Sequence, residues 1–417
     1  MMFGMARFLR FWTCRWKLMH HGLLLAVFLV TIFMLIYSIS TANDLFPKTC
    51  SRQGKPSPLQ TALPCYPRWD LMFLKIHKTG SSTVLNILFR YGEKHQLKFA
   101  FPAGGRNDFA YPAPFSRRTV SGYSPAICYN IVANHMRFEP VALAGLLPRE
   151  RFYFTILRQP ASLFESSFHY YGPAVPLTWR IAGRDKMESF LRDPWAYYTP
   201  RAFNGHYLRN LQFFDLGQDK DMDPHDPRLG DIFQDLEARF SLVMLTEYFD
   251  ESLILLKELL CWELEDVLYF RLNSRVASEV TPLDPMLEDQ ARSWNQLDSL
   301  LYAHFNHTFW RKVEIFGRRR MIWEVAELRW LNAKMAEACI EGGGPVEASQ
   351  VREPAFRSWQ PAGKRSIVGY NRKAGIEEPY QDLCEAMLTP EMQYMGRMGV
   401  SLWKMRLWAF FRDLVSW

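Results

Sequence analysis

The order of apolar and polar residues predicts alternating strands and helices. The short apolar run at residues 71–76 predicts a buried strand, and residues 82–91 follow it with apolar side chains at helical spacing. Residues 129–133, 152–157 and 241–245 predict three further strands, the first two each followed by a segment of helical character. Because strands that alternate with helices are typical of parallel sheets, we expect an α/β fold with a mainly parallel sheet flanked by helices.

The second half of the chain is predicted to be mostly helical. Residues 250–262 are strongly amphipathic, and residues 283–340 carry a helical pattern over most of their length. Residues 402–412 mix large aromatic side chains with Lys and Arg. This last stretch predicts an amphipathic helix packed on the domain, with contact to a membrane surface as the alternative.

An uncharged, strongly apolar segment lies near the N-terminus, at residues 22–43. About 20 residues suffice to cross the hydrocarbon of a bilayer as a helix. The four charged residues that precede it are all Arg or Lys, and Asp44 follows it. The positive-inside rule therefore predicts an uncleaved transmembrane signal-anchor with a cytosolic tail at residues 1–21, a type II single-pass arrangement. A cleaved signal peptide is the alternative.

The residues beyond this segment divide into two regions. Residues 44–69 contain four prolines and no hydrophobic period, which is typical of a stem that holds a domain away from the membrane. Residues 70–417 form the predicted lumenal domain. We find no internal repeat and no low-complexity tract in it.

Composition and charge exclude several classes of protein. Of the 417 residues, 48% are apolar and 22% are charged, which excludes a disordered or collagen-like chain. The formal net charge is +7, and four of the excess positive charges lie in the first 21 residues. The remainder carries too little charge for general nucleic-acid binding, so no nucleic-acid partner is expected.

Cysteines and a glycosylation sequon agree with a lumenal domain. Cys14 is predicted to be cytosolic, which leaves six cysteines beyond the membrane, an even number that allows three disulfides in 15 possible pairings. These six are Cys50, Cys65, Cys128, Cys261, Cys339 and Cys384. Asn306-His307-Thr308 is the one sequon, so Asn306 is the predicted glycosylation site.

The segment between the first predicted strand and helix carries candidate phosphate-binding residues. It reads Lys75-Ile76-His77-Lys78-Thr79-Gly80-Ser81-Ser82-Thr83. A loop of this kind directs backbone N–H groups and hydroxyls at one point, where the helix dipole and a lysine add positive charge. The spacing differs from that of a Walker A motif. It predicts a site for a phosphate or phosphosulfate, with an ordinary helix start capped by Ser82 or Thr83 as the alternative.

Two other motifs follow predicted strands. Arg158 ends the strand at residues 152–157, and Ser166 lies on the next predicted helix, so that the two can bind a second phosphate. His135 directly follows the strand at residues 129–133. Because strand ends of such sheets face the ligand crevice, His135 is a candidate catalytic residue.

These motifs, in this order, resemble the Golgi carbohydrate sulfotransferases that use 3′-phosphoadenylyl sulfate (PAPS), and specifically the galactose-3-O-sulfotransferase family. The resemblance covers nearly the whole predicted lumenal domain. It also includes Gly105-Arg106-Asn107-Asp108-Phe109, Leu163-Phe164-Glu165-Ser166-Ser167-Phe168-His169-Tyr170, Cys261-Trp262-Glu263-Leu264-Glu265 and Gly369-Tyr370-Asn371. The fold that it implies is the P-loop-like sulfotransferase fold.

The resemblance also implies roles for single residues. Lys78 through Thr83 match the loop that binds the 5′-phosphosulfate, with Lys78 as the catalytic lysine, and Arg158 and Ser166 match the site for the 3′-phosphate. His135 matches the histidine base of related enzymes, and His77 is a rival for that role. The family usually has Arg-Asp-Pro where this chain has Arg158-Gln159-Pro160. We expect donor binding to survive this change, because the arginine is retained.

The implied reaction is sulfuryl transfer from PAPS to the 3-hydroxyl of a terminal β-galactose in the Golgi, without a metal. Several stretches are most similar to members that act on galactosylceramide, with glycoprotein N-acetyllactosamine or O-glycans as the alternative acceptors. A homodimer is left open as the oligomeric state.

Two rival functions remain at this point. A metal-dependent Golgi glycosyltransferase often carries a DxD motif, and Asp221-Met222-Asp223 spells one. Because polar residues and Pro224 surround this triplet, we interpret it as a solvated turn. A lectin-like binding protein is the other rival, and it would tolerate the loss of Lys78.

Overall fold

The computed structural model describes residues 65–148, 150–276, 282–360, 367–405 and 407. The predicted tail and signal-anchor, and the stem up to residue 64, lie outside these residues. Within the described ranges, no helix has the length and apolar character needed to cross a membrane.

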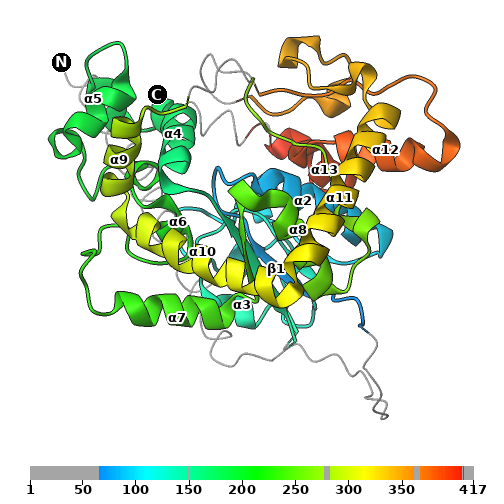
Figure 1. The fold of residues 1–417 in the computed structure, drawn as a ribbon, viewed down its shortest axis with the longest axis horizontal. Coiled ribbons are helices and arrows are strands. Elements are labelled where there is room, and N and C mark those ends of the chain that lie inside the picture. The colour runs from blue at the N-terminus through cyan, green and yellow to red at the C-terminus, as the bar shows by residue number, and fades with distance from the viewer. Residues whose placement is uncertain (1–64, 149, 277–281, 361–366, 406, 408–417) are drawn as a thin grey trace, which may run out of the picture. The chain divides into compact units, whose positions relative to one another are not determined.

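Five parallel strands form one sheet at the centre of the domain (Figure 1), in the order β2-β3-β1-β4-β5. The strands are β1 Leu71–Leu74, β2 Phe99–Ala100, β3 Ile131–Val132, β4 Phe152–Leu157 and β5 Leu242–Leu245. Every residue of β1, β4 and β5 is buried, as expected for a parallel sheet covered on both faces. The predicted parallel α/β architecture is thus confirmed. Only the two-residue strand β2 was missed, because so short a strand leaves no pattern.

Helices pack on both sides of this sheet (Figure 1). The helices of the described residues are α2 Ser81–Lys94, α3 Pro140–Ala144, α4 Pro160–Tyr171, α5 Lys186–Arg192, α6 Leu211–Asp215, α7 Leu229–Arg239, α8 Phe249–Leu260, α9 Pro285–Trp294, α10 Gln296–Phe316, α11 Arg318–Cys339, α12 Gln381–Leu388 and α13 Glu391–Arg397. The helical prediction for residues 283–340 is confirmed by α9, α10 and α11. The amphipathic segment at residues 250–262 forms α8, whose inner face supplies buried leucines to the core.

The sheet order brings the predicted motifs to one edge. Strands β3, β1 and β4 are neighbours, and their carboxyl ends lead into His135, Lys75 and Arg158. Helix α2 follows β1 directly and is anchored by buried apolar side chains such as Leu85 and Phe89. Because parallel strands end at a common edge, residues from three separate segments face one crevice.

A second, smaller hydrophobic cluster joins α4, α5 and α9 beside the sheet. Phe164, Phe168, Phe190 and Trp294 pack in it. This cluster holds the segment between α4 and α6 in place next to the crevice.

Disulfides connect distant parts of the chain. Cys65 pairs with Cys261, and Cys339 pairs with Cys384, so that the end of α11 is tied to α12. Cys128 is disulfide-bonded as well. Asn306 lies inside α10 and is half-buried, and the use of its sequon stays a prediction.

Removing the Cys339–Cys384 bond is expected to lower the free energy of unfolding by about 2–5 kcal/mol, because the bond closes a long loop in the unfolded chain. Chemical denaturation of Cys339→Ala/Cys384→Ala beside the unsubstituted protein measures the loss. The single Cys384→Ala variant should lose a similar amount. An unchanged denaturation midpoint in the double variant would contradict the expectation.

Candidate active site

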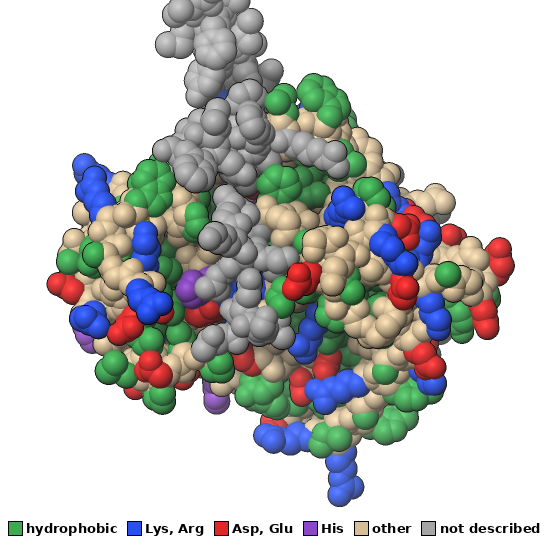
Figure 2. Space-filling view, turned by 90° about the horizontal axis from the view of Figure 1, so that it is seen from above, with side chains coloured by type: hydrophobic (Ala, Val, Ile, Leu, Met, Phe, Trp, Pro, Cys, Tyr) green, Lys and Arg blue, Asp and Glu red, His purple; other side chains and the backbone are tan. Residues whose placement is uncertain are grey.

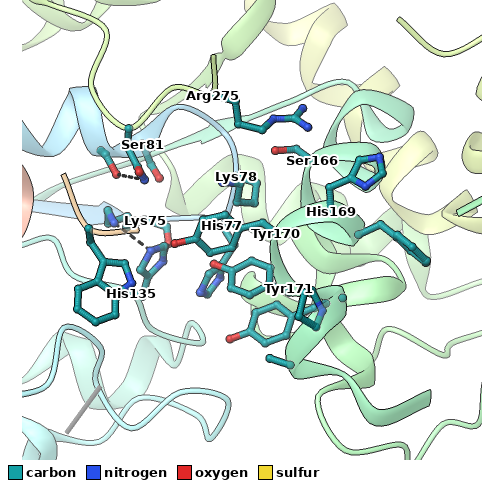
Figure 3. A pocket seen from close by; sticks show the side chains of 18 of the residues that line it. Lys75, His77, Lys78, Ser81, His135, Ser166, His169, Tyr170, Tyr171 and Arg275 are labelled. Atoms are coloured by element: carbon teal, nitrogen blue, oxygen red, sulfur yellow. Dashed lines mark hydrogen bonds between the residues drawn. The ribbon is translucent and has the colours of Figure 1, made fainter. Parts of the chain in front are cut away.

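The crevice at the carboxyl edge of the sheet is a cavity of about 1660 Å³. A pocket for one small ligand usually measures about 300–1,000 Å³, so this cavity has room for two ligands side by side. All candidate catalytic and donor-binding residues of the sequence line it except Thr79. Figure 3 shows side chains from the β1–α2 loop, from α4 and from the end of β3 directed toward a common space.

The loop between β1 and α2 presents an open helix N-terminus to the cavity. Lys78 and Gly80 adopt left-handed backbone conformations, with φ of 61° and 77°. Gly80 is the N-cap residue of α2, and no side chain caps the helix there. The alternative of a helix start capped by Ser82 or Thr83 is therefore wrong. The N–H of Thr83 donates to the carbonyl oxygen of Gly80 at 3.1 Å. The N–H groups of Ser81 and Ser82, at the first two positions of α2, have no partner within the helix, so an anion could accept from them.

Most hydroxyls of the loop after β1 bind other parts of the protein and do not point at the predicted anion site. The hydroxyls of Thr79 and Ser81 donate to the carbonyl oxygen of Ile76, at 3.1 and 2.8 Å, and so hold the loop closed. The hydroxyl of Thr83 accepts from the backbone N–H of Leu272 at 3.2 Å. Only Ser82 directs its hydroxyl toward the cavity side chain of Glu391, at 3.4 Å. The backbone and the lysines are thus the better candidates for an anion than the hydroxyls.

Positive charge is concentrated beside this helix N-terminus. The Lys78 ammonium is buried over the ring of Tyr170, 3.7 Å from its centroid. Burial, together with the neighbouring charges of Arg275, Arg158 and Lys75, lowers the pKa of Lys78 to about 7. Among the described residues, no carboxylate forms an ion pair with Lys78. Burial destabilises an unpaired cation, and an anion that binds beside it stabilises the charge again.

The other cations around Lys78 are each held in place. The Arg158 guanidinium donates to the carbonyl oxygen of Lys78 at 3.1 Å, and burial lowers its pKa. Arg275 forms a two-point ion pair with Glu165, at 2.8 and 2.6 Å. Ser166 follows Glu165 on α4, is buried and lines the cavity. Figure 3 shows Ser166 and Arg275 facing the same space on one side of Lys78.

Two histidines stack next to this cationic cluster. The rings of His77 and His135 lie 3.9 Å apart and nearly parallel, at 9°. Nδ1 of His135 lies 2.8 Å from the carbonyl oxygen of Lys75, and Nε2 lies 2.9 Å from the Lys75 ammonium. A carbonyl only accepts, so Nδ1 carries the hydrogen and Nε2 accepts from Lys75. Burial, then the nearby charges of His77 and Lys75, set the pKa of His135 well below its usual value.

His77 has a different environment. Its Nδ1 lies 2.8 Å from Oδ2 of the fully buried Asp215, and its backbone N–H donates to the same oxygen at 3.0 Å. The other oxygen of Asp215 accepts from the hydroxyl of Tyr111 at 2.7 Å. Because the carboxylate accepts from Nδ1–H, the lone pair of His77 is on Nε2. Of the two histidines, His77 is therefore the one whose free nitrogen is not engaged by a lysine.

Aromatic rings form one wall of the cavity beside His77. Tyr171 and Tyr207 stack at 3.8 Å, and each meets the ring of His77 edge-on, at 5.7 and 5.5 Å. This wall offers flat apolar faces close to the nitrogen that could accept a proton. A sugar ring, which has both hydroxyls and C–H faces, suits such a surface.

Sequence reasoning missed several residues of the site. Asp215 is 138 positions from its partner His77 in the sequence. Glu391 pairs with Lys75 at 2.8 Å and is 316 positions from Lys75. Tyr111, Tyr170 and Arg275 also gave no local signal that separates them from ordinary core or surface residues. Only the fold brings these residues to the loop after β1.

The structure explains Gln159, which replaces the usual aspartate of the family, and the DxD triplet at residues 221–223. Gln159 caps α4, since its side-chain oxygen accepts from the N–H of Ser162 at 2.9 Å. The amide thus performs locally what an aspartate would do there. Asp221-Met222-Asp223 lies in a turn, as predicted, but Asp221 is partly buried and pairs with Arg209 at 3.1 Å rather than facing solvent.

No group of three or more metal-ligating side chains is present in the described ranges. Metal independence stays a prediction.

Comparisons with known proteins agree with this geometry. A family model described as galactose-3-O-sulfotransferase matches residues 5–402. The human protein named galactosylceramide sulfotransferase is 50% identical over 416 residues, which covers 96% of this chain and 98% of the human one. The mouse protein of the same name is 51% identical, with 95% and 97% covered. The pig protein named galactose-3-O-sulfotransferase 2 is 41% identical, with 80% and 84% covered.

The full-length family match and these identities, together with a cationic loop and a paired histidine at one sheet edge, establish that this chain belongs to the galactose-3-O-sulfotransferase family of enzymes.

Proposed function

We propose that this enzyme transfers a sulfuryl group from PAPS to the 3-hydroxyl of a terminal β-galactose, with galactosylceramide as the acceptor. The observation that carries the proposal is the buried Lys78, held without a carboxylate partner among the described residues, beside the open N-terminus of α2 and the ring of His77. The name shared by the human and mouse relatives supports the lipid acceptor. We further propose a Golgi location with the catalytic domain in the lumen.

The residues of the site fit the donor that the family implies. PAPS supplies the sulfuryl group when bound and carries phosphates at two positions. The N–H groups at the start of α2, with Lys78 and Lys75, would hold its 5′-phosphosulfate. Arg158, which donates to the carbonyl oxygen of Lys78, and Ser166 of α4 would hold its 3′-phosphate. Arg275 lies beside them but is engaged by Glu165.

We assign the proton transfer to His77. Nε2 of His77 would accept the proton of the galactose hydroxyl while the oxygen attacks sulfur, and Asp215 would stabilise the resulting imidazolium. His135 is less suited, because its Nε2 accepts from Lys75. Lys78 would stabilise the negative charge that develops on the departing phosphate oxygen. Tyr171 and Tyr207 would position the sugar.

The direct test supplies the full chain with labelled PAPS and two acceptors, galactosylceramide in detergent micelles and soluble N-acetyllactosamine. Preferential labelling of the lipid is expected. Preference for the soluble sugar would move the proposal to the glycoprotein-modifying members of the family. Labelling of neither acceptor would overturn it.

The efficiency of donor use, measured as kcat/KM for PAPS, is expected to fall as pH rises through about 7. The pKa of Lys78 is lowered to about 7, so its ammonium is present below that pH and is lost above it. Bound donor raises this pKa again, so kcat should fall only at higher pH than kcat/KM does. An arginine stays charged, so Lys78→Arg should remove the alkaline fall while lowering the maximum. A flat kcat/KM profile up to pH 9 would contradict the expectation.

A further inference from the structure

Two exposed aromatic side chains stand at the opening of the catalytic cavity. Trp179 and Phe203 both line the cavity, yet 47% and 61% of their surfaces are exposed. The indole N–H of Trp179 donates to the carbonyl oxygen of Pro173 at 2.9 Å, so the outward face of the ring is purely apolar. Exposed apolar side chains gathered at the entrance of a site are typical of a surface that contacts a partner or a lipid.

The backbone that carries Trp179 is well anchored. Trp179 lies in a short 3-10 helix, Pro176–Arg180, and the buried hydroxyl of Thr178 donates to the carbonyl oxygens of Gly172 and Val175 at 2.7 and 2.9 Å. Val175 and Ile181 on either side are buried in the second hydrophobic cluster. The exposure of Trp179 is therefore a property of a fixed segment, not of a side chain on a long loop.

The stretch between Trp179 and Phe203 carries a net positive charge. Five Lys and Arg residues and three Asp and Glu residues lie between the two aromatic residues. Asp185 and Asp193 accept backbone N–H groups as helix caps, and Glu188 pairs with Arg192. Arg184 and Lys186 are exposed and line the cavity. We call Trp179, Phe203, Arg184 and Lys186 the cavity rim.

Figure 2 shows the domain from above Figure 1, so that it includes the side of α5 and also the segments that follow α11. On its described part, large hydrophobic side chains reach the surface among Lys and Arg side chains, with Asp and Glu interspersed. Tryptophan and phenylalanine side chains combined with Lys and Arg are typical of proteins that lie in a lipid–water interface, because the rings enter the headgroup region and the cations stay at its phosphate-bearing surface.

We propose that the cavity rim docks on the surface of the lipid layer that carries the acceptor. The inference rests on the proposed function. An acceptor with hydrocarbon chains keeps them in the lipid layer, so its sugar reaches His77 only when the cavity opening meets that surface. The rim places apolar rings and cations at that opening. A lipid layer is the expected occupant of the cavity rim, because the acceptor that enters the cavity is itself embedded in that layer. A protein partner has no such link to the reaction.

The test compares two acceptors with the full-length enzyme: galactosylceramide in mixed micelles of phosphatidylcholine and phosphatidylserine, and soluble N-acetyllactosamine. The double variant Trp179→Ser/Phe203→Ser is expected to lose at least tenfold in kcat/KM for the lipid, and at least fivefold more than for the soluble sugar. The apolar variant Trp179→Phe/Phe203→Leu should keep most of the lipid activity. The matched control is Trp323→Ser/Trp330→Ser on α11, two residues that are 67% and 60% exposed but do not line the cavity.

A second arm tests the cations of the rim. Arg184→Glu/Lys186→Glu should lower kcat/KM for galactosylceramide more in micelles that contain phosphatidylserine than in phosphatidylcholine alone, because the new carboxylates are repelled by the anionic headgroups. Calorimetric binding of adenosine 3′,5′-bisphosphate should stay within twofold in every variant, which shows that the cavity is intact even if the soluble sugar is a poor acceptor. Full lipid activity in the serine variant would overturn the proposal, as would parallel losses on both acceptors. If the unsubstituted enzyme labels neither acceptor, the proposed function fails instead.

Discussion

Replacing Lys78 by alanine is expected to lower kcat at least 100-fold and to leave the fold intact. Lys78 is a buried cation two residues before the N-cap of α2, and its charge has no carboxylate partner among the described residues. Removing one such group that stabilises a departing oxyanion usually costs about 100- to 1,000-fold. Steady-state rates of galactosylceramide sulfation measure the loss. A lectin-like protein would keep its galactoside binding without Lys78, and an enzyme would lose its turnover.

The backbone at Lys78 supplies an internal control. Its φ of 61° is left-handed, a conformation that costs any residue with a Cβ about 1–2 kcal/mol relative to glycine. Lys78→Ala keeps that cost and Lys78→Gly removes it, so the glycine variant should unfold at a higher denaturant concentration than the alanine variant. Both should be equally inactive. If activity followed stability instead, Lys78 would be a structural residue. Lys94→Ala, at the exposed C-terminal end of α2, should leave turnover unchanged.

The architecture could be predicted because each strand and helix is encoded by a short continuous segment of the chain. The strands after which Lys75, His135 and Arg158 stand are continuous apolar runs, and a parallel sheet aligns their ends. The sequence also predicted an anion-binding start of α2, but it left a start capped by Ser82 or Thr83 as the alternative, which the structure excludes. The local pattern could not predict which group each hydroxyl of the loop after β1 binds. Thr79 and Ser81 turned inward, toward Ile76, and no spacing rule distinguishes that from a ligand contact.

The partners of the key side chains could not be predicted for a different reason. Asp215 ends a five-residue helix, and nothing in its neighbourhood marks an acid destined for burial. Its position depends on Asp298 of α10, which accepts the N–H groups of Gln212 and Phe213. Gln212 also bonds both backbone groups of Arg158, at 2.7 and 3.0 Å. Helix α6 thus connects the candidate phosphate site with His77 through contacts that exist only in the folded chain.

Replacing Asp215 by asparagine is expected to lower kcat about 100-fold or more, with little change in KM for PAPS. The carboxylate accepts from both Nδ1–H and the backbone N–H of His77, which leaves Nε2 as the acceptor. An asparagine keeps its amide oxygen at the position of Oδ2, because the backbone N–H of His77 can donate only to an oxygen there. The substitution therefore removes the negative charge that would stabilise the imidazolium. The rate of sulfuryl transfer in a single turnover measures the effect.

A positioning role and a merely structural role predict different patterns for the neighbours of Asp215. Tyr111→Phe removes one hydrogen bond to Asp215 and leaves both bonds to His77, so kcat should fall less than tenfold. His77→Ala should be as inactive as Asp215→Asn, and the double variant no worse, because the two residues act as a unit. His135→Ala should retain more activity than His77→Ala, since Nε2 of His135 is already engaged by Lys75. The reverse order would make His135 the base and Asp215 a buried acid that only supports the fold.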